Sequence, residues 1–243
     1  MQTSFERCKA HRRRILELSQ RGPSHVAPAF SCLEIVDLIY YDMKRPEDVF
    51  IMSKGHGCLA QYVVLESMGL LRADDPRLGG HPDYGGHIEA STGSLGHGLG
   101  MAVGMAYAEY LKGTDKRIYV LMSDGEMQEG STWEAAQMAA KLKLDNLIVF
   151  VDANGYGGLD IIQGVEPMPQ KFESCGWEAS RVQDGHDAES MKFTAKRRLG
   201  SQPYVMIAHT TKGRGASFMV GAPIWHYKSP NAKEYAKALE ELA

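Results

Sequence analysis

The sequence predicts one α/β domain, built as a doubly wound, mostly parallel sheet flanked by helices. Three short apolar runs without alternation, at residues 118–122, 147–151 and 204–208, have the composition of strands covered on both faces. A helical pattern at 132–142 separates the first two runs. The first run, this helix and the second run therefore form a predicted βαβ unit over residues 118–151. Because neither a repeat nor a linker interrupts the pattern, we expect residues 1–243 to form a single domain.

The composition is that of a globular protein, with 44% hydrophobic and 23% charged residues. A chain of 243 residues buries a substantial core without disulfides or a structural metal. The net charge of -3 argues against a broad nucleic-acid-binding surface. No apolar run approaches the roughly 18 residues of a membrane span, and the charged N-terminal pattern lacks a signal-peptide core. The four cysteines lack disulfide or metal spacing, so we expect reduced thiols and a cytoplasmic protein.

Helical patterns account for the first part of the chain. The segment 5–20 mixes apolar and charged residues at an approximate helical period and ends before Gly22. A second helix is expected to begin at Ser31, with Glu34 three residues later as in a capping box. A third is expected to follow the Gly-His-Gly sequence and to continue through Leu65.

A long irregular stretch occupies residues 72–98 and is rich in Gly, His, Pro and Asp. Stretches of this length inside a compact domain are usually functional or disordered. A helix crowded with Gly, Ala and Met follows at 98–112, and its small side chains suit close packing. A closing amphipathic helix is expected after Asn231.

Polar residues follow the first two predicted strands. Asp124 and Gly125 come after the first, and Asn154 and Gly155 come after the second. Neighbouring parallel strands would bring these positions together at the ligand-binding edge of the sheet. A carboxylate and an amide oxygen suit Mg²⁺, and the glycines let the backbone approach a diphosphate. Asp and Asn are also common turn formers and helix caps, but the pair at this spacing favours the metal site.

These residues belong to a sequence that resembles the thiamine-diphosphate signature of transketolases. The segment Ser-Asp-Gly-Glu-Met-Gln-Glu-Gly begins at Ser123, where the family has a glycine, and Asp-Ala-Asn-Gly-Tyr closes the signature at 152–156. The resemblance implies a domain of the thiamine-diphosphate-binding fold. It also implies that Asp124, Asn154 and the backbone carbonyl of Tyr156 bind Mg²⁺, or Ca²⁺ or Mn²⁺ in its place.

The resemblance covers roughly residues 5–240 and includes several loops in the family's order. These loops are Met-Ser-Lys-Gly-His-Gly at 52–57, Gly-His-Pro-Asp at 80–83, Thr-Gly-Ser-Leu-Gly-His-Gly at 92–98, Thr-Lys-Gly-Arg-Gly at 211–215 and Trp-His at 225–226. The implied cofactor-binding residues are His56, Gly93, Ser94, Leu95, Asp124, Gly125, Glu126, Asn154, Tyr156, Lys212 and His226.

The implied catalytic residues are His25, His56, His81, His226 and Glu129. The segment around His25 reads Ser-His-Val-Ala-Pro, whereas the family usually has Gly-His-Pro-Gly. By the resemblance, His25 and His81 face the donor substrate, and imidazole is suited to moving protons near neutral pH. Glu129 matches a glutamate at the family's dimer interface; the alternative is a helix N-terminal glutamate favoured by the helix dipole.

The family's cofactor is held between two domains, one for the diphosphate and one for the aminopyrimidine with its activating glutamate. The sequence resembles only the first of these. We therefore expect an N-terminal subunit that is inactive alone and that joins a separate chain of pyrimidine and C-terminal domains, as an α₂β₂ heterotetramer by family analogy. A truncated form of a longer chain is the alternative.

The resemblance implies transfer of a two-carbon ketol unit from a ketose or ketose phosphate to an aldehyde, a reaction of carbohydrate metabolism. Alternatives are the α subunit of a 2-oxo acid decarboxylase or dehydrogenase, and an acyl or ketol transferase of specialised metabolism. A non-catalytic binding or regulatory subunit is an alternative of another class. A zinc site of His81, His87 and His97 is also conceivable, although these residues lack paired metal-ligand spacing.

Overall fold

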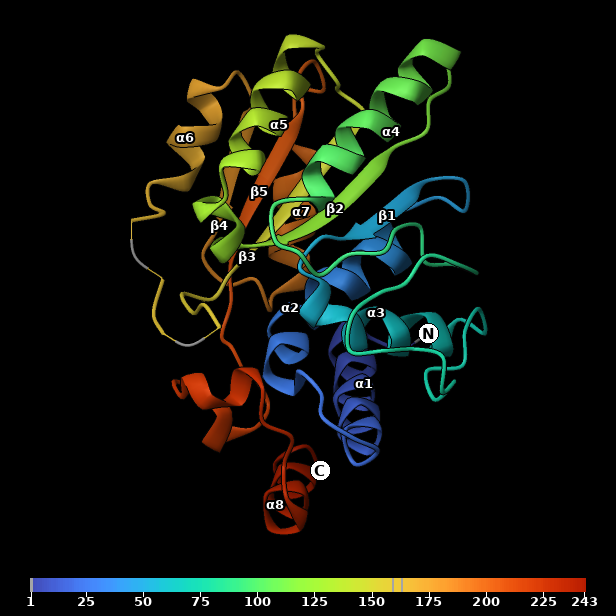
Figure 1. The fold of residues 1–243 in the computed structure, drawn as a ribbon, viewed down its shortest axis with the longest axis vertical. Coiled ribbons are helices and arrows are strands. Elements are labelled where there is room, and N and C mark those ends of the chain that lie inside the picture. The colour runs from blue at the N-terminus through green and yellow to red at the C-terminus, as the bar shows by residue number, and fades with distance from the viewer. Residues whose placement is uncertain (1, 159, 163) are drawn as a thin grey trace.

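The computed structural model describes residues 2–158, 160–162 and 164–243. Its centre is a parallel five-stranded sheet with the strand order β1-β2-β3-β5-β4. The strands are β1 (Val49–Met52), β2 (Ile118–Ser123), β3 (Leu147–Ala153), β4 (Glu178–Val182) and β5 (Tyr204–His209). Helices cover both faces of this sheet (Figure 1), which confirms the predicted doubly wound α/β fold.

Two helical layers enclose the sheet. The helices are α1 (Ser4–Ser19), α2 (Val26–Leu38), α3 (Cys58–Ser67), α4 (Gly98–Lys112), α5 (Gly130–Lys141), α6 (Met168–Ser174), α7 (Ala188–Lys196) and α8 (Ala232–Glu241). Buried residues of α1, α2, α3 and α7 share one apolar core with the sheet, and those of α4, α5 and α6 share a second core on its other face. Short helical turns also occur at Ile39–Met43, Gly55–Gly57, Asp124–Gln128, Ser217–Met219 and Pro223–His226.

The central strands contact both layers, as their lack of alternation predicts. Every residue of β2 and β3 is buried. In β2, Tyr119 and Leu121 belong to the core with α1 and α2, whereas Val120 and Met122 belong to the core with α4 and α5. Successive side chains of a strand point to opposite faces, so a strand covered on both faces requires apolar residues throughout.

The second helix begins earlier than predicted. It starts at Val26, and its cap position is His25 rather than Ser31. Pro28 lies in the first turn, where proline costs no backbone hydrogen bond. Ser31 is buried within the helix, and its hydroxyl donates to the Asp152 carboxylate at 2.6 Å. The Ser31 capping pattern was therefore misleading, because the apolar residues before it are already helical.

Four elements were not predicted from the sequence, namely β1, β4, α6 and α7. β1 is only four residues long, and β4 is a sheet-edge strand with the polar sequence Glu-Ala-Ser-Arg-Val and mostly half-exposed side chains. Short or polar elements give little periodicity to detect. The predicted helices at 5–20, 98–112, 132–142 and the C-terminus correspond to α1, α4, α5 and α8.

The carboxyl ends of β1, β2, β3 and β5 all lie at the same edge of the sheet because the strands are parallel. The loops that leave this edge begin at Ser53, Asp124, Asn154 and Thr210. They form the region where ligands bind in open α/β sheets. Among the described residues, the cysteines are free thiols and no helix has the length and apolarity that crossing a membrane requires.

Candidate functional site

Four histidines from distant parts of the chain meet at this edge. His25 caps α2, His56 lies in the turn after β1, His226 ends the turn Pro223–His226, and His81 lies in the long irregular stretch. The ring centre of His25 is 5.5 Å from that of His81 and 5.3 Å from that of His226, and His56 is 4.9 Å from His226. The structure thus brings together the four histidines singled out in the sequence.

Burial keeps three of these rings neutral near pH 7. It lowers the pKa of His25, lowers the pKa of His56 well below its usual value, and lowers the pKa of His226 to about 3. The Nδ1–H of His25 donates to the His226 carbonyl at 2.6 Å, which leaves its Nε2 as an acceptor. The Lys212 ammonium, which can only donate, lies 2.9 Å from Nδ1 of His226, so Nε2 of His226 carries the proton.

Lys212 is the uncompensated cation of the site. It is buried, and its ammonium also donates to the Gly157 carbonyl at 3.0 Å. Burial, assisted by the charge of Lys54, lowers the pKa of Lys212 to about 8. Lys212 forms no ion pair with any described residue. A buried ammonium without a counter-ion favours an anionic ligand such as a diphosphate.

The loop that carries Lys212 is held from behind by a polar chain of contacts. The backbone N–H of Thr211 donates to Nε2 of His186 at 2.8 Å, and Nδ1 of His186 lies 2.9 Å from the Glu34 carboxylate. Glu34 forms a buried ion pair with Arg12 at 2.7 Å. None of these contacts was visible in the sequence, because their members come from α1, α2 and two loops.

Asp124 and Asn154 approach each other as the predicted βαβ unit requires. Ser123, one position before Asp124, and Asp152, two positions before Asn154, are register neighbours on β2 and β3. Oδ2 of Asp124 accepts a hydrogen bond from the backbone N–H of Gly155 at 2.6 Å. Its Oδ1 is buried and has no hydrogen-bond partner among the described residues. Burial and the nearby Asp152 charge raise the pKa of Asp124 to about 7, so a cation beside it would relieve an electrostatic cost.

The orientation of the Asn154 amide follows from its neighbours. Its Nδ2 donates to the Asp152 carboxylate at 3.2 Å, and a carboxylate can only accept. The amide oxygen therefore points the other way, where it accepts from the backbone N–H of Tyr156 at 3.0 Å and keeps a free lone pair. The unpartnered oxygen of Asp124, this amide oxygen and the Tyr156 carbonyl are hard donors that fit a small divalent cation.

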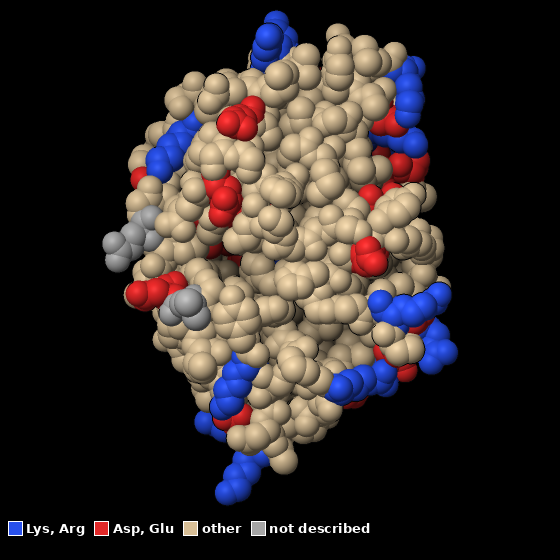
Figure 2. Space-filling view, in the orientation of Figure 1, with Lys and Arg blue, Asp and Glu red and all other residues tan. Residues whose placement is uncertain are grey.

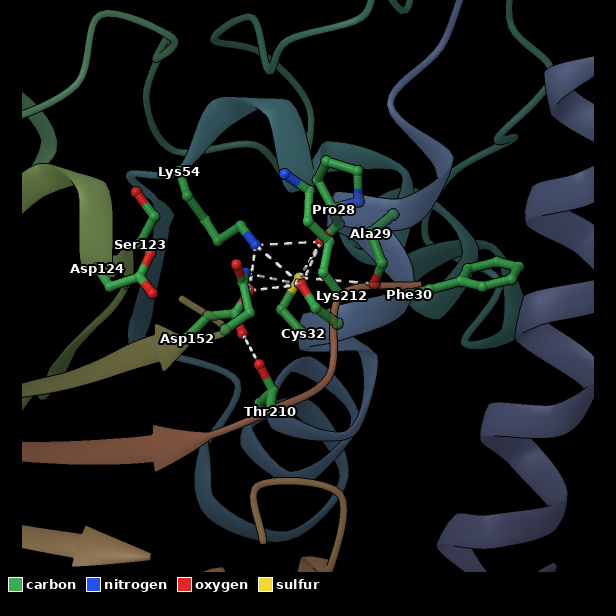
Figure 3. A network of polar contacts seen from close by, with 12 residues as sticks. Pro28, Ala29, Phe30, Cys32, Lys54, Ser123, Asp124, Asp152, Thr210 and Lys212 are labelled. Atoms are coloured by element: carbon green, nitrogen blue, oxygen red, sulfur yellow. Dashed lines mark hydrogen bonds and ion pairs between the residues drawn. The ribbon is translucent and has the colours of Figure 1, made fainter. Parts of the chain in front are cut away.

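A buried ion pair joins Lys54 and Asp152 in a polar network next to Asp124 (Figure 3). Both side chains are fully buried. Thr210 and Ser31 donate to the Asp152 carboxylate, and the Lys54 ammonium also donates to the Pro28 carbonyl at 3.0 Å. Sequence inspection noted the polar cluster at Asp152 but found no partner for it, because Lys54 is 98 positions away.

Glycines allow three loops of the site to pack closely against one another. A Cβ on Gly55 would lie 2.8 Å from Cα of Gly93, and a Cβ on Gly93 would lie 2.9 Å from Cδ2 of His81. Gly93 also has a φ of +146°, which other residues rarely adopt. Any side chain at either glycine would separate these loops and move His81.

The predicted ligand Glu126 lies behind the site surface. Its buried carboxylate accepts hydrogen bonds from the backbone N–H groups of Ser123 at 2.9 Å and Gly96 at 3.2 Å, and from the hydroxyl of Ser53. Glu126 thereby joins the loops that follow β1 and β2 to the loop before α4. Glu126 would therefore act on a ligand indirectly, by holding these loops in position.

The remaining predicted residues lie around the same edge. Leu95 is half-buried, and a Cβ on Gly125 would lie 3.8 Å from its Cδ1. Ser94 is exposed and lines a groove between α4 and α5. Glu129 is exposed at the start of α5, where its side chain makes no capping hydrogen bond. A separate cavity of about 450 Å³ opens beside His25, between segments 21–25, 58–62 and 73–80.

The alternative zinc site does not form. Across residues 2–158, 160–162 and 164–243, no group of three His, Cys, Asp or Glu side chains is arranged to hold a metal ion. The hypothesis of a site built from His81, His87 and His97 is therefore wrong. The magnesium hypothesis differs in kind, because it needs one carboxylate together with amide and carbonyl oxygens.

The sequence matches the transketolase thiamine diphosphate binding domain over residues 40–242. The chain belongs to the transketolase family. It is 40% identical to one of the subunits of apulose-4-phosphate transketolase from Actinobacillus succinogenes, with 98% of this chain and 95% of that protein covered. It is 32% identical to the 6-deoxy-6-sulfo-D-fructose transketolase subunit SqwG of a Clostridium species, with 93% and 90% covered.

Transketolase from Leishmania mexicana has the same fold, with a TM-score of 0.91 and 26% identity. The match covers 100% of this chain but only 41% of that structure. Because the related subunits are similar to it over nearly their whole length, the chain corresponds to the N-terminal, thiamine-diphosphate-binding subunit of divided transketolases. This result confirms the predicted family and fold and the predicted type of subunit.

The buried neutral His226 predicts a loss of stability in acid. Its pKa is about 3 in the folded chain and 6.5 when unfolded, so between these values the unfolded state binds the additional proton. Stability contributed by the neutral ring is complete above pH 6.5 and falls as pH decreases, by at most about 1.4 kcal/mol per pH unit. We expect H226Q to show a shallower decline in urea-unfolding free energy from pH 7 to pH 5.

The matched control is H87Q, because His87 is exposed in the irregular stretch. It should keep the slope of the unmodified chain. An unchanged slope in H226Q would show that His226 is not the titrating group.

Proposed function

We propose that this chain and a separate pyrimidine-domain subunit together transfer a two-carbon ketol unit from a ketose donor to an aldehyde acceptor. The observation that carries the proposal is the buried, unpartnered Asp124 oxygen at the same edge as the unpaired Lys212 and four histidines. A metal cation would bind the Asp124 oxygen, and an anionic phosphate would pair with the Lys212 ammonium. Neutral imidazoles can accept and donate the protons of hydroxyl groups. The related subunits named as transketolases support the same reaction.

The residues at this edge fit thiamine diphosphate with Mg²⁺, or Ca²⁺ or Mn²⁺ in its place. Asp124, Asn154 and the Tyr156 carbonyl would hold the metal, and Lys212 and His226 would donate to the diphosphate. The backbone at Gly93 and Gly125, together with Ser94 and Leu95, would lie along the cofactor. When bound, this cofactor supplies a stabilised carbanion that serves as an electron sink.

The histidines would orient the donor and move its protons. Nε2 of His25 is an acceptor, so it can take a hydrogen bond or a proton from a hydroxyl group. Nε2 of His226 is a donor that can hold an oxygen of the substrate or of the diphosphate. His81 is solvent-exposed beside His25, and His56 is half-buried between the two sides of the cluster. The donor's hydroxyls would therefore lie between His25 and His81.

The partner subunit would dock on the face formed by α4 and α5. Figure 2 shows few charged side chains in the middle of this face, and Lys and Arg lie mostly at its rim. Gly100 and Gly104 have open space beside them on α4, and a groove of about 660 Å³ separates α4 from Met138 on α5. Leu111 is 66% exposed at the end of the same helix. Small and exposed apolar residues together suit close helix packing by another chain.

Glu129 lies at the edge of this face, beside Gly96. We place it at the subunit interface, with an α₂β₂ assembly as the expected stoichiometry. The free cysteines are consistent with a reducing, cytoplasmic location. The names of the relatives indicate a phosphorylated or sulfonated ketose as donor.

The proposal is tested by calorimetric titration of thiamine diphosphate and Mg²⁺ into this chain, alone and mixed with the chain encoded beside it. We expect binding to appear or to tighten sharply in the mixture, and ketol transfer to require both chains. D124N should weaken cofactor binding by more than about 100-fold, because it removes the charged metal ligand. A ketose phosphate should serve as donor, and pyruvate should not.

Turnover by this chain alone would contradict the two-subunit proposal. A folded complex that binds no cofactor would make the chain a non-catalytic subunit. A preference for pyruvate would instead favour the 2-oxo acid enzymes.

Asp152 should act on the metal site through Asn154. D152L removes the acceptor that orients the amide and leaves Lys54 buried without its partner, so it should cost about 3–5 kcal/mol of unfolding free energy. The double variant K54M/D152L removes both charges and should recover most of that stability. Both variants should lose about 10- to 100-fold in Mg²⁺-dependent cofactor affinity.

Urea unfolding and calorimetry separate the two effects. The control pair is Arg77 and Asp75, an exposed ion pair whose removal should change neither quantity. Full cofactor affinity in the double variant would show that Asp152 has only a structural role.

His81 should affect turnover more than cofactor binding. We expect H81A to reduce turnover by about 10²- to 10⁴-fold, the usual range for a lost proton-transfer group, with cofactor affinity nearly unchanged. H87A in the same irregular stretch is the control and should retain full activity. Normal turnover by H81A would remove His81 from the site.

A further inference from the structure

A second cavity, of about 300 Å³, lies at the opposite edge of the sheet. Its floor is formed by Tyr119 of β2, Ile148 of β3 and Tyr204 of β5, which are direct register neighbours. These residues are at the amino ends of their strands, whereas the candidate active site is at the carboxyl ends. Tyr119 and Ser123 are four positions apart on β2, which corresponds to roughly 13 Å along the strand.

The walls of this cavity are basic. Four basic side chains line it, namely Arg117, Lys192, Lys196 and Arg198, and Asp42 is the one acidic residue of the lining. Asp42 is already paired with Lys192 at 2.6 Å. In the described part of the chain, the other three basic side chains form no ion pair. This concentration of positive charge contrasts with the net charge of -3 of the whole chain.

Arg198 distinguishes the cavity from an ordinary solvated helix face. Its Nη1 is buried and has no hydrogen-bond partner among the described residues. Basic side chains on a helix face normally extend their charged ends into water. A buried guanidinium N–H without an acceptor is costly. Because Arg198 also lines the cavity, rotation of its side chain would bring the guanidinium into contact with an anion there. The backbone N–H of the next residue, Leu199, donates to both carboxylate oxygens of Glu178, which holds the adjoining chain in place.

We propose that this cavity binds a small phosphorylated molecule, with its phosphate on the guanidinium groups of Arg117 and Arg198. Guanidinium groups bind phosphate through paired, charge-assisted hydrogen bonds. Lys196 is exposed and adds a further cation to the lining of the cavity. A volume near 300 Å³ is at the lower end of the range for small-molecule sites. This site is independent of the proposed ketol transfer.

Calorimetric titration of inorganic phosphate and of AMP tests the proposal. The background is the full chain carrying K212A, so that the cation of the candidate active site does not contribute. R198Q and R117Q should each weaken phosphate and AMP binding about tenfold or more, as expected for loss of one charge-assisted contact. R72Q makes the same charge change at a side chain that is 82% exposed elsewhere, and it should bind as tightly as the background protein.

K196Q provides a second test that does not depend on Arg198. Lys196 is exposed, so this variant should fold, which thermal unfolding verifies, and it should also bind phosphate more weakly. The proposal is overturned if the background protein binds neither probe at millimolar concentration. It is also overturned if R198Q and K196Q bind as tightly as the background, or if R72Q weakens binding as much as they do.

Discussion

The buried ion pair between Lys54 and Asp152 is the interaction on which the candidate site depends. An ammonium and a carboxylate that are fully buried lose their hydration, and only close pairing with further hydrogen bonds offsets that loss. Here the partners come from four different segments: Lys54 follows β1, Asp152 is the penultimate residue of β3, Ser31 belongs to α2 and Thr210 follows β5. The polar contacts therefore require these segments to meet in one arrangement, which also fixes the positions of the loops above them.

This arrangement determines the charges that a ligand meets. Asp152 orients the Asn154 amide and, together with burial, raises the pKa of Asp124. Lys54 is paired with Asp152. Burial lowers the pKa of Lys212, and the positive charge of Lys54 lowers it further. Among the described residues, the site thus keeps one carboxylate oxygen without a hydrogen-bond partner and one ammonium without an ion-pair partner, which is the pattern that a metal diphosphate complements.

How far the sequence predicts this site depends on how local each signal is. Asp124 and Asn154 could be paired from the sequence alone, because a βαβ unit fixes which strand ends are adjacent. The histidine cluster followed only from the family resemblance, since His25 and His226 are 201 positions apart. Lys54 could not be paired with Asp152 for the same reason. Ser31 shows the opposite error, in which a local capping pattern was overridden by a buried helix that begins at Val26.

The unsatisfied groups of the site connect its stability to its function. Asp124 and Lys212 each carry a burial cost in the chain alone, and a buried neutral His226 adds a further cost in acid. A ligand that brings a divalent cation and a diphosphate compensates both charges at once, so it binds the folded chain and not the unfolded one. Such a ligand stabilises the fold in proportion to the logarithm of its concentration. The residues that make the unliganded edge unfavourable are therefore the same residues that would give a bound metal diphosphate its binding energy.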